Sequence, residues 1–286
     1  MTVVTRFAPS PTGPLHLGHA YSALKAFDFA RKNNGKFLLR IEDIDQSRSR
    51  QSWEEQIYQD LTWLGISWDG PVLRQSERFE AYHSGLKMLS EKRLIYPCSC
   101  NRKDILSALS APQEGVEVPF GPDGPIYPGT CRNEQITDQA KVGGALRINM
   151  RKASELLDYP IYFQEMSFIF GGVSISQNEL IEEIGDIVLS RKDMGTSYHL
   201  SVILDDAYQG VTDVIRGDDL FEATKIHVLL QKLFGLDTPT YHHHRLIRDA
   251  NGKRLAKRDD ARAISKYRED GYSPSDIREL VKLPAA

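Results

Sequence analysis

The chain has 286 residues, of which 41% are hydrophobic and 26% charged, with a formal net charge of −3. This composition is typical of a soluble globular protein with a sizeable core, and we expect a cytoplasmic protein without a leader or membrane span. The charge offers no global basic surface, so any RNA must contact local basic patches. Three cysteines, an odd number, argue against a disulfide framework and leave metal binding open.

The first thirty residues predict a strand, a loop and a helix. A β-branched run at 3–5 enters the string RFAPSPTGPLHLGH at 6–19, and apolar residues at helical spacing follow. The N-terminus of a helix binds phosphate through its unpaired N–H groups. His16 and His19 fall on one face of the first turn, and Gly18 lets a purine or ribose approach the backbone. We interpret this stretch as a nucleotide site; the alternative is an ordinary loop with exposed histidines.

A buried strand at 36–41 ends in acidic residues at 42–45. Acidic residues at the carboxyl end of a parallel strand lie where open α/β sheets bind ligands, although a solvated acidic turn is the alternative. Two amphipathic helices follow, with apolar positions from Trp53 to Leu64 and from Phe79 to Leu89. We assign both helices a structural role only.

An inserted module is expected from residue 96 to residue 180. Nine of the twenty positions from 111 to 130 are Pro or Gly, too many for a helix or a central strand. Strands are expected at 145–150 and 161–170, broken by the glycines at 171–172. Cys98, Cys100 and Cys131 lie in this module and could supply three corners of a tetrahedral zinc site. Three unlinked buried thiols are the alternative.

The chain is expected to return to the nucleotide-binding sheet with a strand at 186–193. A later buried strand carries Arg216 to its carboxyl end, before Gly217 and a helix opening at 218–219. A guanidinium fixed there would bind a carboxylate by a bidentate fork, with Arg6 as a second guanidinium and Tyr198 as a hydroxyl. A surface salt bridge of Arg216 is the alternative. The predicted substrate is a small acid; glutamate is preferred, and aspartate stays open because one methylene contributes only ~1–3 kcal/mol.

The C-terminal part contains two groups of basic or imidazole side chains. Neighbouring residues of a strand alternate in direction, so only His242 and His244 could share a ligand, and we interpret the run 242–244 as structural. The turn at 249–252 leads into the basic run KRLAKR at 253–258. Helices are expected at 263–269 and from residue 274 onward. A basic loop that contacts RNA is one interpretation of the run at 253–258.

These motifs together resemble a known family. The string at 6–19 resembles the HIGH signature of class I aminoacyl-tRNA synthetases in the glutamyl and glutaminyl branch, and the phrases from 186 to 220 resemble the second half of that catalytic domain. The run at 253–258 resembles the KMSKS loop, with Ala256 in place of the expected hydroxyl. The resemblance covers nearly the whole chain but only the catalytic half of such an enzyme, which is the organisation of the stand-alone glutamyl-Q tRNA(Asp) synthetases.

The fold that the resemblance implies is α/β. It is a Rossmann-like class I catalytic domain formed by residues 1–95 and 181–240, with an inserted, zinc-containing, acceptor-type subdomain at 96–180. Residues 241–286 form the KMSKS-like loop and a short helical segment. No anticodon-binding domain is expected, and we expect a monomer.

The resemblance also implies roles for individual residues. The catalytic residues would be His16, His19 and Lys257. ATP would be bound by His16, Gly18, His19 and Lys257. Glutamate would be bound by Arg6, Phe7, Ala8, Pro9, Ser10, Glu42, Tyr198 and Arg216, with Glu42 beside the ammonium group. One structural zinc ion would be bound by Cys98, Cys100, Tyr127 and Cys131, with Asp123 or a water as the alternative fourth ligand.

The function that follows is ATP-dependent activation of L-glutamate, with Mg²⁺, and its transfer to the queuosine base in the anticodon of tRNA(Asp). Activation needs no protein nucleophile, because the substrate carboxylate attacks the α-phosphorus while the protein positions the reactants and stabilises charge. Two alternatives stay open. One is a truncated synthetase that charges the acceptor end of tRNA(Glu), and the other is a catalytically silent zinc module that only binds RNA.

Overall fold

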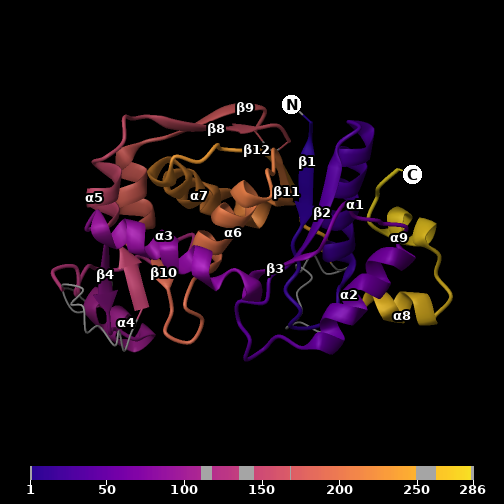
Figure 1. Cartoon of the computed structure of the whole chain (residues 1–286), viewed down its shortest axis with the longest axis horizontal. Coiled ribbons are helices and arrows are strands. Elements are labelled where there is room, and N and C mark those ends of the chain that lie inside the picture. Colours follow the sequence, from indigo (N-terminus) through magenta and orange to yellow (C-terminus); the bar gives the residue numbers. More distant parts are fainter. Residues whose placement is uncertain (1, 111–117, 135–144, 168, 249–261, 285–286) are drawn as a thin grey trace.

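The computed structural model describes residues 2–110, 118–134, 145–167, 169–248 and 262–284 (Figure 1). The helices are α1 (Leu17–Lys32), α2 (Gln51–Trp63), η1 (Gln75–Glu77), α3 (Phe79–Glu91), α4 (Arg102–Ser110), α5 (Met150–Ser154), η2 (Glu179–Ile184), α6 (Tyr198–Tyr208), η3 (Asp218–Leu220), α7 (Phe221–Phe234), α8 (Ile264–Glu269) and α9 (Pro274–Leu280). The strands are β1 (Val4–Phe7), β2 (Lys36–Ile41), β3 (Leu73–Arg74), β4 (Ile95–Cys98), β5 (Phe120–Gly121), β6 (Gly124–Pro125), β7 (Ala145–Ile148), β8 (Ile161–Glu165), β9 (Gly171–Ile175), β10 (Val188–Ser190), β11 (Asp213–Gly217) and β12 (Thr240–His244). None of the described helices is both long and apolar enough to cross a bilayer.

A largely parallel arrangement of strands forms the centre of the molecule. β2 pairs in parallel with β1 and β3, and β12 pairs in parallel with β11 and β8. The two groups meet where the backbone N–H of Thr212, just before β11, donates to the carbonyl of Val4 in β1 (3.0 Å). In Figure 1, β1 and β11 accordingly run side by side. The predicted α/β class is confirmed, and the order of strands reverses between β1 and β11, where open α/β sheets bind ligands.

A second sheet, with the order β10-β7-β4, is antiparallel and lies away from α8 and α9 in Figure 1. The prediction that residues 186–193 rejoin the nucleotide-binding sheet is therefore wrong. The reason is Asp186, whose carboxylate accepts hydrogen bonds from Tyr96 Oη (2.5 Å), Arg132 Nε (2.8 Å) and the Met150 N–H (2.8 Å). These bonds hold the segment against the insert, and β11 is the strand that returns to the centre.

Two further strand predictions need correction. The expected strand at 145–150 ends at Ile148, because Asn149 caps α5 by accepting a hydrogen bond from the Lys152 N–H. The glycines at 171–172 open β9 rather than break a strand, and they lie opposite Glu165 and Gln164 in an antiparallel hairpin. This hairpin joins the central strands, since Tyr241 of β12 pairs with Glu165 of β8.

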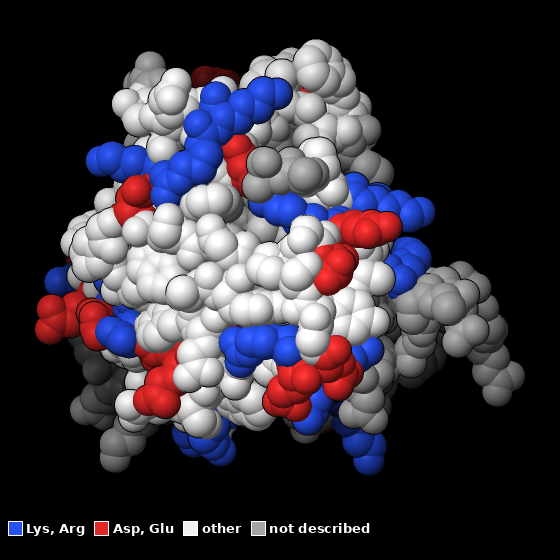
Figure 2. Space-filling model, turned by 90° about the vertical axis from the view of Figure 1, so that its right-hand side faces the viewer, with Lys and Arg blue, Asp and Glu red and all other residues white. Residues whose placement is uncertain are grey.

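The amphipathic helices bury the predicted faces. Ile57 and Leu61 of α2 and Leu89 of α3 are fully buried at 0% exposure. On the outer side, α9 is tied to α1 by an ion pair between Arg278 and Asp28 (2.8 Å). Figure 2 views the side that carries α8 and α9, and it shows basic and acidic groups interspersed on a largely uncharged surface. The described part of this face therefore offers no extended basic field to a polyanion.

Candidate active site and metal centre

A cavity of about 390 Å³ lies at the junction of β1 and β11, beyond their carboxyl ends. Its lining includes most residues that the sequence assigned to substrate binding: Arg6, Phe7, Ala8, His16, Gly18, His19, Glu42, Tyr198 and Arg216. Pro9 and Ser10 follow these residues in the loop after β1 and are not part of the lining. The sequence did not single out Ser22, Asp219, Leu220, Leu246 or Ile247, which also line it.

His16 and His19 form the N-terminal cap of α1. The backbone N–H of Gly18 donates to His16 Nδ1 (3.1 Å), and the backbone N–H of His16 donates to His19 Nδ1 (3.2 Å). Since each Nδ1 is an acceptor, each neutral ring carries its hydrogen on Nε2. The two ring centroids lie 3.8 Å apart. A Cβ at residue 18 would lie 3.0 Å from His16 Cε1, so glycine is also required for the close approach of this ring.

Lys257 lies outside the described residues, as does the whole predicted KMSKS-like run at 253–258. The residues before this segment line the cavity, and those after it contact the loop that carries His16. Leu246 and Ile247 line the cavity. Ala263 forms a β-bridge with His16, and the Ile264 N–H donates to the carbonyl of Leu15 (2.8 Å).

Arg6 is held by a carboxylate that the sequence did not reveal. Asp206 of α6 accepts hydrogen bonds from Arg6 Nε (3.0 Å) and Nη2 (3.3 Å), and Arg40 Nη2 lies 2.8 Å from Asp206 Oδ1. No described residue accepts a hydrogen bond from Arg6 Nη1. Burial opposes the charge of Asp206, but Arg6 and Arg40 outweigh burial and lower its pKa. Asp206 thus fixes one edge of the Arg6 guanidinium and leaves Nη1 for a ligand.

Glu42 is a buried carboxyl group that lines the cavity. Its carboxylate lies 3.5 Å from Arg40 Nη2, and its side chain is 11% exposed. Burial raises the pKa of Glu42 to about 7, although Arg40 and Arg6 act in the opposite direction. A carboxylate that loses so much hydration has a strong preference for a cationic partner such as an ammonium group.

Arg216 is almost fully buried and is held by neutral acceptors. Its Nε donates to His243 Nε2 (3.2 Å) and its Nη1 to His227 Nδ1 (3.1 Å). Its Nη2 donates to Thr224 Oγ1 (2.6 Å) and to the carbonyl of Leu220 (3.3 Å). A guanidinium has five N–H donors, so this arrangement leaves one Nη1 hydrogen for a ligand. A two-pronged fork onto a carboxylate would therefore need Arg6 or Tyr198 as well.

The three consecutive histidines have separate partners. His242 Nε2 lies 2.9 Å from Asp213 Oδ1, and His243 Nδ1 donates to Glu165 Oε2 (2.5 Å). His244 lines the cavity, where its Nε2 lies 3.1 Å from Ser22 Oγ. Burial lowers the pKa of His244, so this ring is neutral at pH 7. The sequence missed its place at the cavity because no local pattern distinguishes it from His242.

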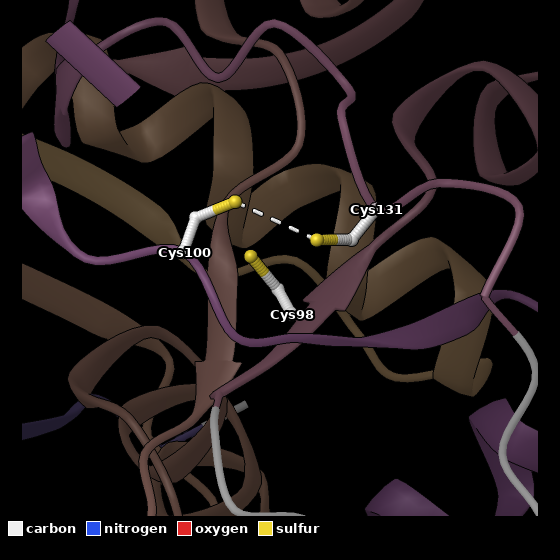
Figure 3. A group of neighbouring side chains, drawn as sticks. All are labelled: Cys98, Cys100 and Cys131. Carbon is white, nitrogen blue, oxygen red and sulfur yellow. Dashed lines mark hydrogen bonds between the residues drawn. The ribbon is translucent and has the colours of Figure 1, made fainter. Parts of the chain in front are cut away.

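The three cysteines converge at the edge of the insert (Figure 3). All three sulfur atoms lie within 4.8 Å of one another, and the Sγ atoms of Cys100 and Cys131 are 3.5 Å apart. The phenol oxygen of Tyr127 lies 3.3 Å from Cys98 Sγ and 3.4 Å from Cys100 Sγ. Asp123 is not part of this cluster: its Oδ1 lies 3.5 Å from His199 Nε2.

These separations suit a tetrahedral zinc ion. Zinc–sulfur bonds of about 2.3 Å and zinc–oxygen bonds of about 2.0 Å would place sulfurs about 3.8 Å apart and each sulfur about 3.5 Å from the oxygen. Burial opposes ionisation of Cys131, but hydrogen bonds from Tyr127 and from the backbone of Ser99 outweigh it and lower its pKa to about 7. The Arg147 guanidinium lies over the Tyr127 ring, 4.0 Å from its centroid. Burial and the hydrogen bonds with the thiols raise the pKa of Tyr127, so a phenolate ligand would need the metal ion to displace its proton.

Known proteins with similar sequence or structure agree with this architecture. Residues 2–284 match the family described as tRNA synthetases class I (E and Q), catalytic domain. The glutamyl-Q tRNA(Asp) synthetase of Rhodobacter capsulatus is 57% identical over 98% of this chain and 100% of its own length. The protein of the same name from Rhodopirellula baltica is 38% identical over 96% of this chain and 83% of its own length.

A solved structure is similar over the same range. The glutamate-tRNA synthetase from Elizabethkingia anophelis superimposes with a TM-score of 0.78 at 29% identity, and the match covers 98% of this chain and 61% of that chain. The family match and this solved structure agree with the α/β fold. The chain therefore belongs to the class I tRNA synthetases of the E and Q type, and it is a ligase of the glutamyl-Q tRNA(Asp) synthetase branch.

Proposed function

We propose that this chain activates L-glutamate with ATP and transfers the glutamyl group to the queuosine base in the anticodon of tRNA(Asp). The observation that carries the proposal is the cavity, in which Arg6, Arg216 and Tyr198 line the same space as Glu42. Two guanidinium groups and a hydroxyl suit a side-chain carboxylate, and one carboxylate suits an ammonium group. The names of relatives such as the Rhodobacter capsulatus protein support the queuosine acceptor.

In the proposed activation step the α-carboxylate of glutamate attacks the α-phosphorus of ATP. A new oxygen–phosphorus bond forms, the bond to the bridging oxygen breaks, and pyrophosphate leaves. The Nε2–H groups of His16 and His19 donate to phosphate oxygens at the N-terminus of α1, where Gly18 allows close approach of the nucleotide. Lys257 adds positive charge, and Mg²⁺ would neutralise phosphate oxygens when bound.

In the proposed transfer step a hydroxyl of the RNA attacks the carbonyl carbon of the glutamyl adenylate. The new ester bond forms as AMP leaves. Glu42 holds the ammonium group, Arg6 and Arg216 hold the side-chain carboxylate, and Phe7 and Ala8 line the cavity beside the substrate. The protein acts by positioning the anhydride rather than by covalent catalysis.

The metal proposal is one structural zinc ion bound by Cys98, Cys100, Tyr127 and Cys131. The separations of the three sulfurs and the phenol oxygen support it. We further propose the division that the resemblance implies, with residues 1–95 and 181–240 as the catalytic domain and 96–180 as the RNA-contacting insert. Two elements cross this division, because the β8–β9 hairpin pairs with β12 and β10 pairs with β7. Residues 241–286 would carry the KMSKS-like loop and the C-terminal helical segment.

A transfer assay tests the acceptor. The protein is incubated with labelled glutamate, ATP and tRNA from queuosine-proficient or queuosine-deficient cells. We expect label only in the first pool, and omission of ATP should abolish it. Equal labelling of both pools would argue against queuosine as the acceptor. If the label were released together with the terminal adenosine, the chain would instead charge the acceptor end of tRNA(Glu).

A further inference from the structure

Behind Arg216, two imidazole rings and a carboxylate form a continuous line that leads to the insert. Arg216 Nη1 lies 3.1 Å from His227 Nδ1, and His227 Nε2 lies 3.1 Å from His199 Nδ1. His199 Nε2 lies 3.5 Å from Asp123 Oδ1 in the turn between β5 and β6. We propose that His227, His199 and Asp123, here called the relay, are positioning residues that fix Arg216 for the side-chain carboxylate of the substrate. This inference rests on the proposed activation of glutamate.

The direction of every hydrogen bond in the relay follows from Arg216. A guanidinium only donates, so His227 Nδ1 must accept and its hydrogen must be on Nε2. That Nε2–H donates to His199 Nδ1, which places the hydrogen of His199 on Nε2, opposite Asp123. The nearby carboxylate of Asp123 favours this tautomer of His199, and His199 in turn favours the tautomer of His227 that can accept from Arg216. With the other tautomer, His227 would direct an N–H group at the guanidinium.

Burial makes this arrangement strict. His227 is 1% exposed and His199 is 7% exposed, so water has little access to the hydrogen bond between the two rings. The Asp123 side chain is 34% exposed, so solvent reaches only that end of the relay. Burial, with Arg216 beside it, holds the pKa of His227 well below its ordinary range, and the ring stays neutral. The rings of Tyr198 and His227 lie 5.6 Å apart, so the relay also packs against another residue of the cavity.

The relay explains why Arg216 keeps its charge available. Arg6 is paired directly with Asp206, whereas the four groups that accept from Arg216 are two imidazoles, a hydroxyl and a carbonyl. Carboxylates lie only one or two rings away, at Glu165 behind His243 and at Asp123 behind His199. A guanidinium oriented by neutral groups in a buried site binds an anionic ligand more strongly than one that is already neutralised.

The position of Asp123 is set by the insert. The hairpin of β5 and β6 packs against η2 so tightly that a Cβ at Gly121 would lie 2.5 Å from the carbonyl oxygen of Glu183. The Ile126 N–H closes the hairpin by donating to the carbonyl of Pro119 (2.9 Å). The relay thus connects a hairpin of the insert to the residue that selects the acidic side chain.

Steady-state ATP–pyrophosphate exchange on the full-length protein tests the relay. His199→Phe keeps a ring but removes both nitrogens, and we expect KM for glutamate to rise about three- to tenfold while KM for ATP changes less than twofold. The preference for glutamate over glutamine, measured as the ratio of kcat/KM, should fall by a similar factor. The amide oxygen of His199→Gln can accept from His227. In this variant the increase in log KM for glutamate should be at most half of that in His199→Phe.

Asp123→Ala should raise KM for glutamate at least twofold, and Asp123→Asn, which keeps an oxygen acceptor, should stay closer to the parent protein. Asp104→Ala is the matched control, because Asp104 also lies in the insert but accepts its hydrogen bond from the N–H of Asn101. Circular dichroism shows whether His199→Phe folds. If it does not fold, the comparison of Asp123→Ala with Asp123→Asn tests the relay by itself.

An unchanged KM for glutamate in folded His199→Phe and Asp123→Ala would overturn the relay, as would an equal rise in KM for ATP. These results differ from failure of the proposed function, in which the parent protein itself would show no glutamate-dependent exchange.

Discussion

Glu42 is a buried carboxyl group, and in the proposed function it holds the ammonium group of the substrate. Because burial raises its pKa to about 7, a large part of Glu42 is protonated and neutral just below that pH in the absence of substrate. A neutral carboxyl group no longer attracts the ammonium group. We therefore expect KM for glutamate in the exchange reaction to be about tenfold higher at pH 6 than at pH 8.

The control for this pH dependence is Glu42→Gln, which is neutral at every pH. This variant should show a raised KM that is nearly constant between pH 6 and pH 8. A parent protein whose KM is equally flat would show that ionisation of Glu42 does not govern substrate binding.

Asp206 is the residue on which the arrangement of cations depends. Asp206→Asn would leave Arg6 and the completely buried Arg40 without their shared counter-ion. Removing one partner of a buried ion pair costs about 3–5 kcal/mol, so we expect the free energy of unfolding in urea to fall by about 3 kcal/mol or more. Glu269→Gln, which breaks the exposed pair with Lys266, should leave the unfolding midpoint unchanged. A stable Asp206→Asn protein would contradict this account of Arg6.

Patterns in the sequence identified several residues that line the cavity, but not the residues that hold those side chains in place. The string at 6–19 and the acidic end of β2 are local signals, and Arg6, His16, His19 and Glu42 from these two segments line the cavity. The supporting partners are remote: Asp206 is 200 positions from Arg6, and Glu165 is 78 positions from His243. Such pairs leave no periodicity in the sequence, and only the fold brings them together.

At the scale of elements, the same limit explains the errors in the second sheet. Hydrophobic periodicity identified α2 and α3 because each helix buries one continuous stripe. It could not assign β10 to its sheet, because a three-residue strand carries little pattern and its pairing with β7 depends on contacts made by Asp186.

The zinc ion proposed for the insert gives a prediction at this scale. Cys131→Ser removes a ligand that connects the turn after Tyr127 to β4, and zinc per chain should fall from about one equivalent to below a tenth, since a tetrahedral site needs all its ligands. Transfer to RNA should weaken more than glutamate activation, because the cavity lies in the central strands. Ser99→Ala, between two of the thiols, should keep the metal. Less than a tenth of an equivalent of zinc in the parent protein would contradict the proposed zinc site.

At the scale of the whole molecule, the candidate active site lies where β1 meets β11. β1 and β11 come from parts of the chain about 200 residues apart. Arg6 of β1 and Arg216 of β11 both line the cavity. Asp123 of the insert is connected to Arg216 of the cavity through His199 and His227. Leu246 and Ile247, before the segment 249–261, line the cavity, and Ala263, after it, pairs with His16. This convergence is why the order of the strands, rather than any single motif, determines the site.

The cavity lined by Arg6 and Arg216 is proposed to convert glutamate and ATP into glutamyl adenylate. The most direct measurement is the incorporation of labelled pyrophosphate into ATP with glutamate, aspartate or glutamine, with and without tRNA. We predict exchange with glutamate that exceeds exchange with the other two by at least tenfold, and its loss in Arg216→Ala. An absence of glutamate-dependent exchange in the parent protein, even with queuosine-containing tRNA(Asp) present, would contradict the account.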